Sequence, residues 1–357
     1  MAQNAKENLI TQPPARSLFF FALPMIVGNL FQQFYNMADS IIVGNLVGED
    51  ALAAVGASYS FTTVFIMIAI GGGIGASVLT SQYLGAGHYR EMKSSVYTFL
   101  ITFAVFSTLL AVLGFIVNPT VLRLLSTYAV EGKVQRFRSD MFVTGVKVAI
   151  PSIVQQSIVS IGMLLTQSAV NQFGSSALAG YSAGTRLESL CIVPMIATGN
   201  AMSTFTAQNL GAGKPERVRQ GYHAAYGIII GFGVLLAAVS QLFYVPILSA
   251  FVEQGESAVA FETGTAYFRF IGLFFSFLGF KAITDGILRG AGDIKVYMLA
   301  NLINLAIRVA VAQLCSPIWG IELIWYAVPM GWTANYLISY LWYRTGNWER
   351  RNLLRNA

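Results

Sequence analysis

The sequence predicts an all-α, polytopic membrane protein with about nine transmembrane helices. Hydrophobic residues make up 55% of the 357-residue chain and charged residues only 11%, whereas a soluble domain carries about 25% charged residues. The long apolar runs show no alternation of the kind that a strand requires. Because lipid admits only helices and closed barrels as spanning structures, we expect a helical, multi-pass protein of the cell membrane.

Each predicted span follows from the need for about 20 mostly apolar residues per crossing. The candidate spans are 17–42, 51–82, 95–117, 148–170, 177–207, 221–250, 264–288, 296–316 and 320–343. Basic loops, such as the one assigned to Arg289 and Lys295, stay cytoplasmic and alternate with neutral or acidic loops. The linker after the third span breaks the alternation, because it is basic where an external loop is expected.

An odd number of spans is therefore expected to be missing near this linker. We divide the chain into an N-terminal lobe remnant of three helices (1–125), a basic cytoplasmic-type linker (126–147) and a C-terminal lobe (148–357). The C-terminal lobe comprises the last six predicted helices and a short basic tail.

An internal repeat underlies this division. The turn QYLGAG at 82–87 returns as QNLGAG at 208–213, and in the same alignment Ser77 lies over Ser203. We expect the glycines of both turns to permit a tight turn between long helices, and the glycines at 227–231 to permit close helix packing. A repeat of this kind in a membrane chain indicates a transporter built from related halves.

Three motifs together resemble the multidrug and toxic compound extrusion (MATE) family. They are LPMIV with QQFYNMADSIIVG in the first span (23–44), the paired Q-x-L-G-A-G turns, and GILRGAGD at 286–293. The resemblance covers nearly the whole chain and implies two six-helix lobes that export drugs against a sodium or proton gradient. Measured against that pattern, the chain lacks helices four to six of the N-terminal lobe.

Polar residues form a stripe along the first predicted span. They recur at spacings of three and four, which places them on one helical face, and we expect this face to line a water-filled cavity. The stripe comprises Asn29, Gln32, Gln33, Asn36 and Asp39. Its counterparts in the fourth span are Gln156, Ser160 and Met163, while Thr166 replaces Asp39.

Asp39 is the candidate cation-coupling residue. A carboxylate inside a membrane helix costs roughly 2.5–3.5 kcal/mol even on lenient scales and usually marks an ion or proton path. The resemblance implies the same role, because the family has an acidic cation-binding residue in its first helix. The competing interpretation places Asp39 in the interfacial region, near the outer end of its span.

Later spans carry further candidates for lining the cavity. Lys281 and Asp285 lie one turn apart, so a structural salt bridge is the main alternative for them. Asn301, Asn304 and Arg308 share one helical face, and for Arg308 an internal ion-pair anchor is favoured over a substrate ligand.

Several other functions are not supported by the sequence. The formal charge of +6 is spread over short loops, so no nucleic-acid partner is expected. Cys191 and Cys315 lie in apolar runs and indicate neither a disulfide framework nor a zinc site. We find no metal cluster, nucleophile–base pair or cofactor motif, and therefore expect neither an enzyme nor a cofactor beyond a coupling ion, Na+ or H+.

The expected function is export of a small amphipathic organic substrate by an antiporter that works as a monomer in the bilayer. Its mechanism would be alternating access of the two lobes around a central cavity. Two alternatives remain open. One is a lipid-linked oligosaccharide flippase of the same superfamily, and the other is a truncated membrane protein that is inactive or depends on a partner.

Overall fold

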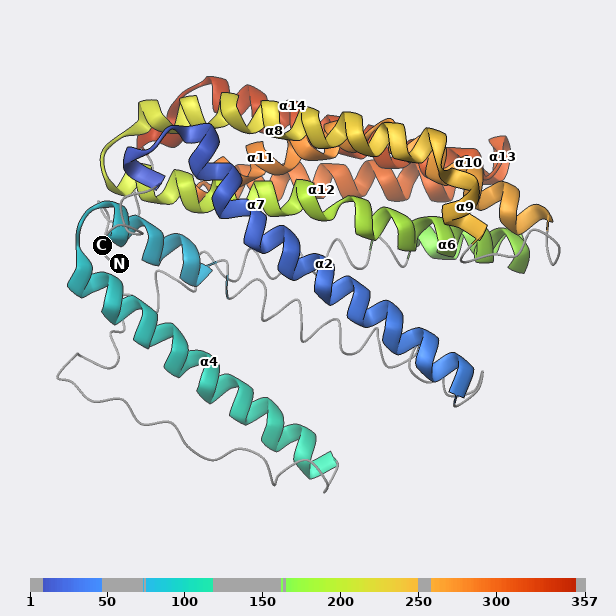
Figure 1. Cartoon of the computed structure of the whole chain (residues 1–357), viewed down its shortest axis with the longest axis horizontal. Coiled ribbons are helices and arrows are strands. Elements are labelled where there is room, and N and C mark those ends of the chain that lie inside the picture. The colour runs from blue at the N-terminus through green and yellow to red at the C-terminus, as the bar shows by residue number, and fades with distance from the viewer. Residues whose placement is uncertain are drawn as a thin grey trace.

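The computed structural model describes residues 9–46, 73, 75–117, 162, 165–249 and 258–350. Within these ranges every regular element is a helix, as the sequence predicts, and short turns join the helices (Figure 1).

The C-terminal half forms an elongated bundle in which α7, α8, α11, α12 and α14 run side by side (Figure 1). The closest packing is between α7 and α11, between α6 and α10, and between α12 and α14. The elements are α6 (Ser175–Cys191), α7 (Val193–Gly211), α8 (Pro215–Leu242), α9 (Tyr244–Ser249), α10 (Ala258–Gly272), α11 (Phe275–Ala291), α12 (Ile294–Ala310), the π-helical turn η2 (Val311–Cys315), α13 (Ser316–Trp319), α14 (Glu322–Arg344) and the 3-10 turn η3 (Asn347–Arg350).

The N-terminal half contributes α2 (Pro14–Leu46), the helix at 75–85 and α4 (Tyr89–Val117). Helix α2 crosses the bundle obliquely and packs against α7 and α8, whereas α4 diverges from it (Figure 1). A small apolar cluster of Leu79, Tyr83 and Phe99 joins α4 to residues 75–85. The main core therefore lies in the C-terminal half, with α2 laid against it.

Three predicted spans are broken and a fourth changes its helix type, which corrects the sequence-based boundaries. Residues 177–207 form α6 and α7, bent by 41°, and residues 264–288 form α10 and α11, bent by 52°. The run at 221–250 divides into α8 and α9, and the run at 296–316 changes to a π-helical turn at Val311.

Proline explains two of these breaks and the change of helix type. Pro194 occupies the first turn of α7, and Pro317 the first turn of α13, while Pro246 lies within the six-residue helix α9. A proline has no backbone N–H and its ring clashes with the preceding turn, so it suits a helix start and disrupts a helix interior. The break between α10 and α11 has no proline, and hydropathy alone gave no sign of it.

Three described helices are long and apolar enough to cross a membrane, and the number rises to five if each bent pair is one span. Two of the predicted spans, 51–82 and 148–170, fall mostly outside the described residues. The total of nine spans therefore stays a prediction, as does the basic linker at 126–147, which also lies outside them.

Glycines set the closest helix contacts, but not at the predicted place. Helices α7 and α11 meet where a Cβ on Gly199 would lie 2.6 Å from the Ala282 carbonyl oxygen, and a Cβ on Gly286 would overlap the carbonyl of Gly199. A Cβ on Gly227 or Gly231, by contrast, would have no described neighbour within 4 Å outside its own stretch of helix. The packing role predicted for those two glycines is wrong, because their side of α8 faces outward.

Candidate functional site

The two Q-x-L-G-A-G turns have the same backbone geometry. Gly87 and Gly213 adopt left-handed conformations, with φ of 75° and 70°, and their N–H groups donate to the carbonyls of Leu84 and Leu210 at 3.2 and 3.0 Å. Such a turn ends a helix and satisfies carbonyls that have no helical partner. The prediction that these glycines make tight turns is confirmed.

The helices that precede these turns touch each other reciprocally. A Cβ on Gly85 would overlap the carbonyl oxygen of Gln208, and a Cβ on Gly211 would overlap that of Gln82. In the repeat alignment Gly85 is equivalent to Gly211, and Gln82 is equivalent to Gln208. The two contacts are therefore equivalent, one made by the glycine of each copy. We call this pair the glycine contact, and it relates the copies by a local pseudo-two-fold axis.

Beside the glycine contact lies a cavity of about 210 Å³ between the two copies. Its lining combines equivalent positions, since Ser77 pairs with Ser203 and Val78 with Thr204 in the repeat alignment. We call it the seam cavity, and its lining consists of Met25, Gly73, Ser77, Val78, Asn200, Ser203, Thr204 and Arg289. Ser77 is exposed whereas Ser203 is buried, so the cavity opens on the side of the first copy.

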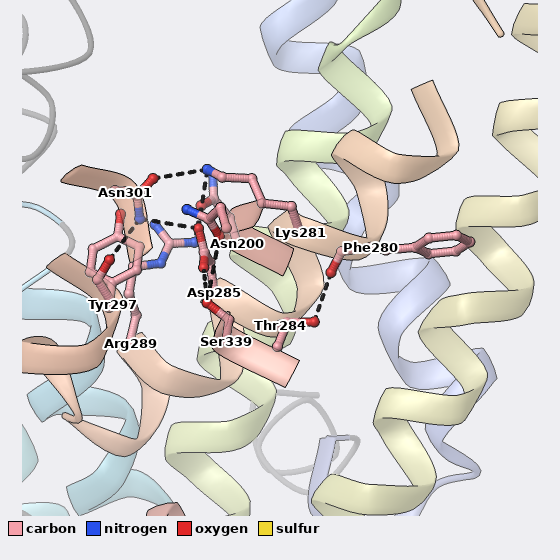
Figure 2. Close-up of polar contacts among 10 residues, drawn as sticks. Asn200, Phe280, Lys281, Thr284, Asp285, Arg289, Tyr297, Asn301 and Ser339 are labelled. Atoms are coloured by element: carbon pink, nitrogen blue, oxygen red, sulfur yellow. Dashed lines mark hydrogen bonds and ion pairs between the residues drawn. The ribbon is translucent and has the colours of Figure 1, made fainter. Parts of the chain in front are cut away.

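Arg289 is the charged residue of the seam cavity. It lies in the last turn of α11, which ends at Gly292 in the left-handed conformation, and its side chain is only 8% exposed. Its Nη2 donates to Asn200 Oδ1 at 2.9 Å and its guanidinium lies 5.7 Å from the ring centroid of Tyr297. Figure 2 shows these groups beside the Asp285 cluster, one helical turn away.

The Nε atom of Arg289 is buried and has no hydrogen-bond partner within the described part of the chain. The sequence placed Arg289 in a basic cytoplasmic loop. That assignment is wrong for this residue, because α11 continues to Ala291 and the chain turns only at Gly292; Lys295 also lies in a helix, in the first turn of α12, where it is exposed.

Asp285 is the centre of a second polar cluster, inside the bundle (Figure 2). It is 3% exposed, and its Oδ2 atom lies 3.1 Å from Lys281 Nζ. Asn301 joins both charges, because its Nδ2 donates to Asp285 at 3.3 Å and its Oδ1 accepts from Lys281 at 3.0 Å. From α14, Ser339 donates to the other Asp285 oxygen at 3.0 Å.

The Asp285 cluster therefore brings together three predicted site residues: Lys281, Asp285 and Asn301. Lys281 and Asp285 form the salt bridge that was the main alternative to cavity lining, and none of the three residues lines the seam cavity. A buried ion pair offsets its loss of hydration only when hydrogen bonds complete the geometry, and Asn301 and Ser339 supply those bonds here.

Asn304 and Arg308 lie one and two turns further along α12. Asn304 is buried against Gly331 of α14, and its Oδ1 has no hydrogen-bond partner among the described residues. Arg308 interacts electrostatically with Glu188 of α6, whose carboxylate accepts a hydrogen bond of 2.5 Å from Tyr267. The structure thus gives Arg308 an acidic neighbour inside the bundle.

The polar stripe of the first span is described only in part. Asn29 and Gln33 are half-buried and Gln32 is exposed. Asn36 and Asp39 lie in α2, but their side chains are outside the described part, as are Gln156, Ser160 and Met163. The cation-coupling role of Asp39 therefore stays a prediction.

Several polar residues around Arg289 and Asp285 were not predicted from the sequence. Asn200 lies among small and hydroxyl-bearing residues (ATGNAMSTFT at 197–206), with no charged residue nearby, and gave little signal. Ser339 follows Asn335 by four residues in the last helix, a spacing that puts both on one face and could have indicated a polar contact. In the described part of the chain, no group of His, Cys, Asp or Glu residues is arranged to hold a metal ion.

Comparison with known proteins gives a family match. The sequence model of the MatE family matches residues 24–133 and 151–314. The probable multidrug resistance protein YpnP of Bacillus subtilis (strain 168) is 23% identical, with 95% of this chain and 96% of the relative covered. A FAD transporter of Shewanella oneidensis (strain MR-1) is 21% identical and covers 69% of this chain and 76% of the relative.

A solved structure has a similar fold. It is described as the outward-facing conformation of a multidrug resistance MATE family transporter of the MOP superfamily. The two chains superpose with a TM-score of 0.85 at 17% identity, covering 95% of this chain and 97% of the other.

Proposed function

Because the chain belongs to the MatE family, we propose that it is a cation-coupled antiporter that exports drugs or other amphipathic organic compounds. It is a multi-pass membrane protein of a transporter family rather than an enzyme. The proposal adds the coupling ion, Na+ or H+, and the mechanism, alternating access by a monomer.

The glycine contact is the observation that carries the mechanism. Two helices from equivalent positions of the repeat meet backbone to backbone at the end that carries the basic turns. A contact made twice by symmetry-related glycines, with a cavity beside it, can close one end of a pathway. Parting of the two copies would open that end, as expected for transporters built from repeats.

Asp39 is the proposed coupling residue, because a carboxylate in the first span has the chemistry to bind Na+ or a proton. Cation binding and substrate binding would each favour a different arrangement of the two copies, and exchange follows from that difference.

The length of the alignment supports an internal loss of helices. The alignment with the Bacillus relative runs over 432 positions, whereas this chain has 357 residues, so at least 75 positions have no residue here (432 minus 357). An antiporter with one reduced lobe has to work with the seam that remains between α2, residues 75–85 and the C-terminal bundle.

The test is dye efflux from cells that express the full chain or its Asp39→Asn variant. We expect the variant to insert normally and to lose efflux by about tenfold or more, since a lost charge interaction of 1.4 kcal/mol already gives a factor of ten. Glu262→Gln, which neutralises an exposed carboxylate of α10, is the matched control and should leave efflux unchanged.

Each other outcome favours a different interpretation. Equal efflux from the Asp39→Asn variant and the unmodified chain refutes coupling through Asp39. No efflux from the unmodified chain favours the inactive or partner-dependent membrane protein. Movement of a lipid-linked oligosaccharide, with no dye efflux, favours the flippase.

A further inference from the structure

We propose that the seam cavity binds an acidic group of the transported compound, a carboxylate or a phosphate, with Arg289 as the counter-charge. This inference rests on the proposed function and adds the charge of the substrate at the site where it meets the protein.

The charged side chains along α11 form one ion pair and leave one cation without a paired anion in the described part of the chain. Lys281 and Asp285 neutralise each other at 3.1 Å. Arg289, one turn further on, has no carboxylate within ion-pair distance among the described residues. Asp293, the next acidic residue along the chain, is 1% exposed, and its Oδ2 accepts a hydrogen bond from Trp342 Nε1 at 2.6 Å. A cation that is 8% exposed and lacks a paired anion is costly, and an anionic ligand would remove that cost.

The lining of the seam cavity supplies several hydrogen-bond donors. Arg289 Nε has no partner in the described structure, and Asn200 accepts from Arg289 through Oδ1, which leaves its amide N–H groups as donors. Ser77 and Ser203 add a hydroxyl from each copy of the repeat. A carboxylate or phosphate, which only accepts when ionised, matches this set of donors.

The volume of the seam cavity limits which part of a compound it can hold. The cavity of about 210 Å³ is smaller than the roughly 300–1,000 Å³ of pockets that enclose a whole drug-sized molecule. It fits the charged end of an amphipathic compound, and the remainder has to extend past the exposed Ser77. Met25 supplies an apolar wall beside this opening.

A positioning role for Arg289 is the competing interpretation. Its hydrogen bond to Asn200 and its contact with the ring of Tyr297 fix the end of α11 against α7 and α12. A purely structural arginine would affect folding and the binding of every ligand alike. An anion site would affect only ligands that carry the acidic group, and this difference can be measured.

The test uses the full chain in phosphatidylcholine nanodiscs, without any ion gradient, and the ligands riboflavin and flavin mononucleotide. These two probes share a ring system and differ by one phosphate, and the Shewanella relative named as a FAD transporter motivates their choice. We expect flavin mononucleotide to bind about tenfold more tightly than riboflavin, because a charged hydrogen-bonded pair contributes at least that factor.

Two substitutions test whether Arg289 is responsible. Arg289→Gln should abolish the preference for flavin mononucleotide and leave riboflavin binding unchanged, whereas Arg289→Lys should retain part of the preference. Arg269→Gln removes the same charge from the exposed end of α10, where Arg269 contacts Gln241 and Tyr244, and should behave as the unmodified chain does. Helical content and thermal unfolding of each variant control for misfolding.

Three results would overturn the proposal. They are equal affinity of the unmodified chain for the two flavins, a preference that survives Arg289→Gln, and equal loss of both flavins in the folded Arg289→Gln variant. A fourth arm adds phosphatidylglycerol to the nanodiscs. If this lipid abolishes the preference, the acidic group belongs to a lipid and not to the transported compound.

Failure of this inference and failure of the proposed function are distinguishable. Binding is measured at equilibrium, so a chain that transports nothing but shows the Arg289-dependent preference refutes the antiporter alone. A chain that extrudes dye through Asp39 but shows no such preference refutes the anion site alone.

Discussion

Two charged clusters of α11 lie one helical turn apart and have opposite surroundings. Asp285 is enclosed by α12 and α14, where Lys281, Asn301 and Ser339 satisfy both of its oxygens. Arg289 faces the seam between the repeat copies, where its described partners are the neutral side chains of Asn200 and Tyr297. Figure 2 shows Asp285 and Arg289, both from α11, with their partners from the neighbouring helices.

The difference separates charges that hold the bundle together from a charge that can bind a ligand. A buried pair completed by hydrogen bonds has little to gain from a ligand, whereas a buried cation without an anion does. Burial of a charge alone therefore does not identify a binding site in this protein. The number of protein partners that the buried charge has does identify one.

Removal of one charge from the Asp285 cluster should give the largest effect. Lys281→Met or Asp285→Asn leaves the other charge buried without its partner, and we expect each to cost about 3–5 kcal/mol of unfolding free energy. The double variant should cost much less than the sum of the two, because no lone charge remains. Unfolding in denaturing detergent, followed by circular dichroism, measures this coupling.

Arg269→Gln is the matched control for this cycle, since that guanidinium is exposed and we expect a change of no more than about 0.5 kcal/mol. Additive losses in the double variant would show that Lys281 and Asp285 act independently, and the contrast between the two clusters would then fail.

A methyl group at the glycine contact should give a smaller effect that reports on the seam. Gly85→Ala places a Cβ against the Gln208 carbonyl, and such overpacking costs about 1–3 kcal/mol. The closed seam should loosen, so a cysteine introduced at the buried Ser203 should react faster with a maleimide in this background.

Gly227→Ala is the control for the seam, because a Cβ there would have no described neighbour within 4 Å outside its own stretch of helix and alanine favours a helix by about 0.8–1.0 kcal/mol over glycine. If both alanine variants are equally stable and label equally at position 203, the glycine contact does not hold the two copies together.

The fold class and the repeat were predictable from the sequence, because both depend on patterns along the chain. Low charge and long apolar runs predict a helical membrane protein. The paired turns predict that the two copies of the repeat are equivalent, and the glycine contact shows this equivalence. Helix breaks were less predictable, since the run at 264–288 stays apolar through its bend at 273–274 and has no proline there.

The polar clusters were only half predictable, because pairing depends on neighbours that are distant in sequence. The spacing of four residues between Lys281 and Asp285 already predicts that they pair. Their partners Asn301 and Ser339 come from two other helices, and only Asn301 was expected near the site. Arg289 was misassigned because the rule for basic loops takes no account of a helix that continues to its capping glycine.

The most direct test of the central claim, that the two repeat copies face each other across a seam that must open, is a crosslink at that seam. After Cys191 and Cys315 are replaced by alanine, cysteines that replace Ser77 and Ser203 should be joined by a short bis-methanethiosulfonate, whose two disulfide links a reductant cleaves. We predict that the crosslinked chain loses dye efflux and regains it on reduction. Full efflux from the crosslinked chain, or no crosslink at all, would contradict the claim.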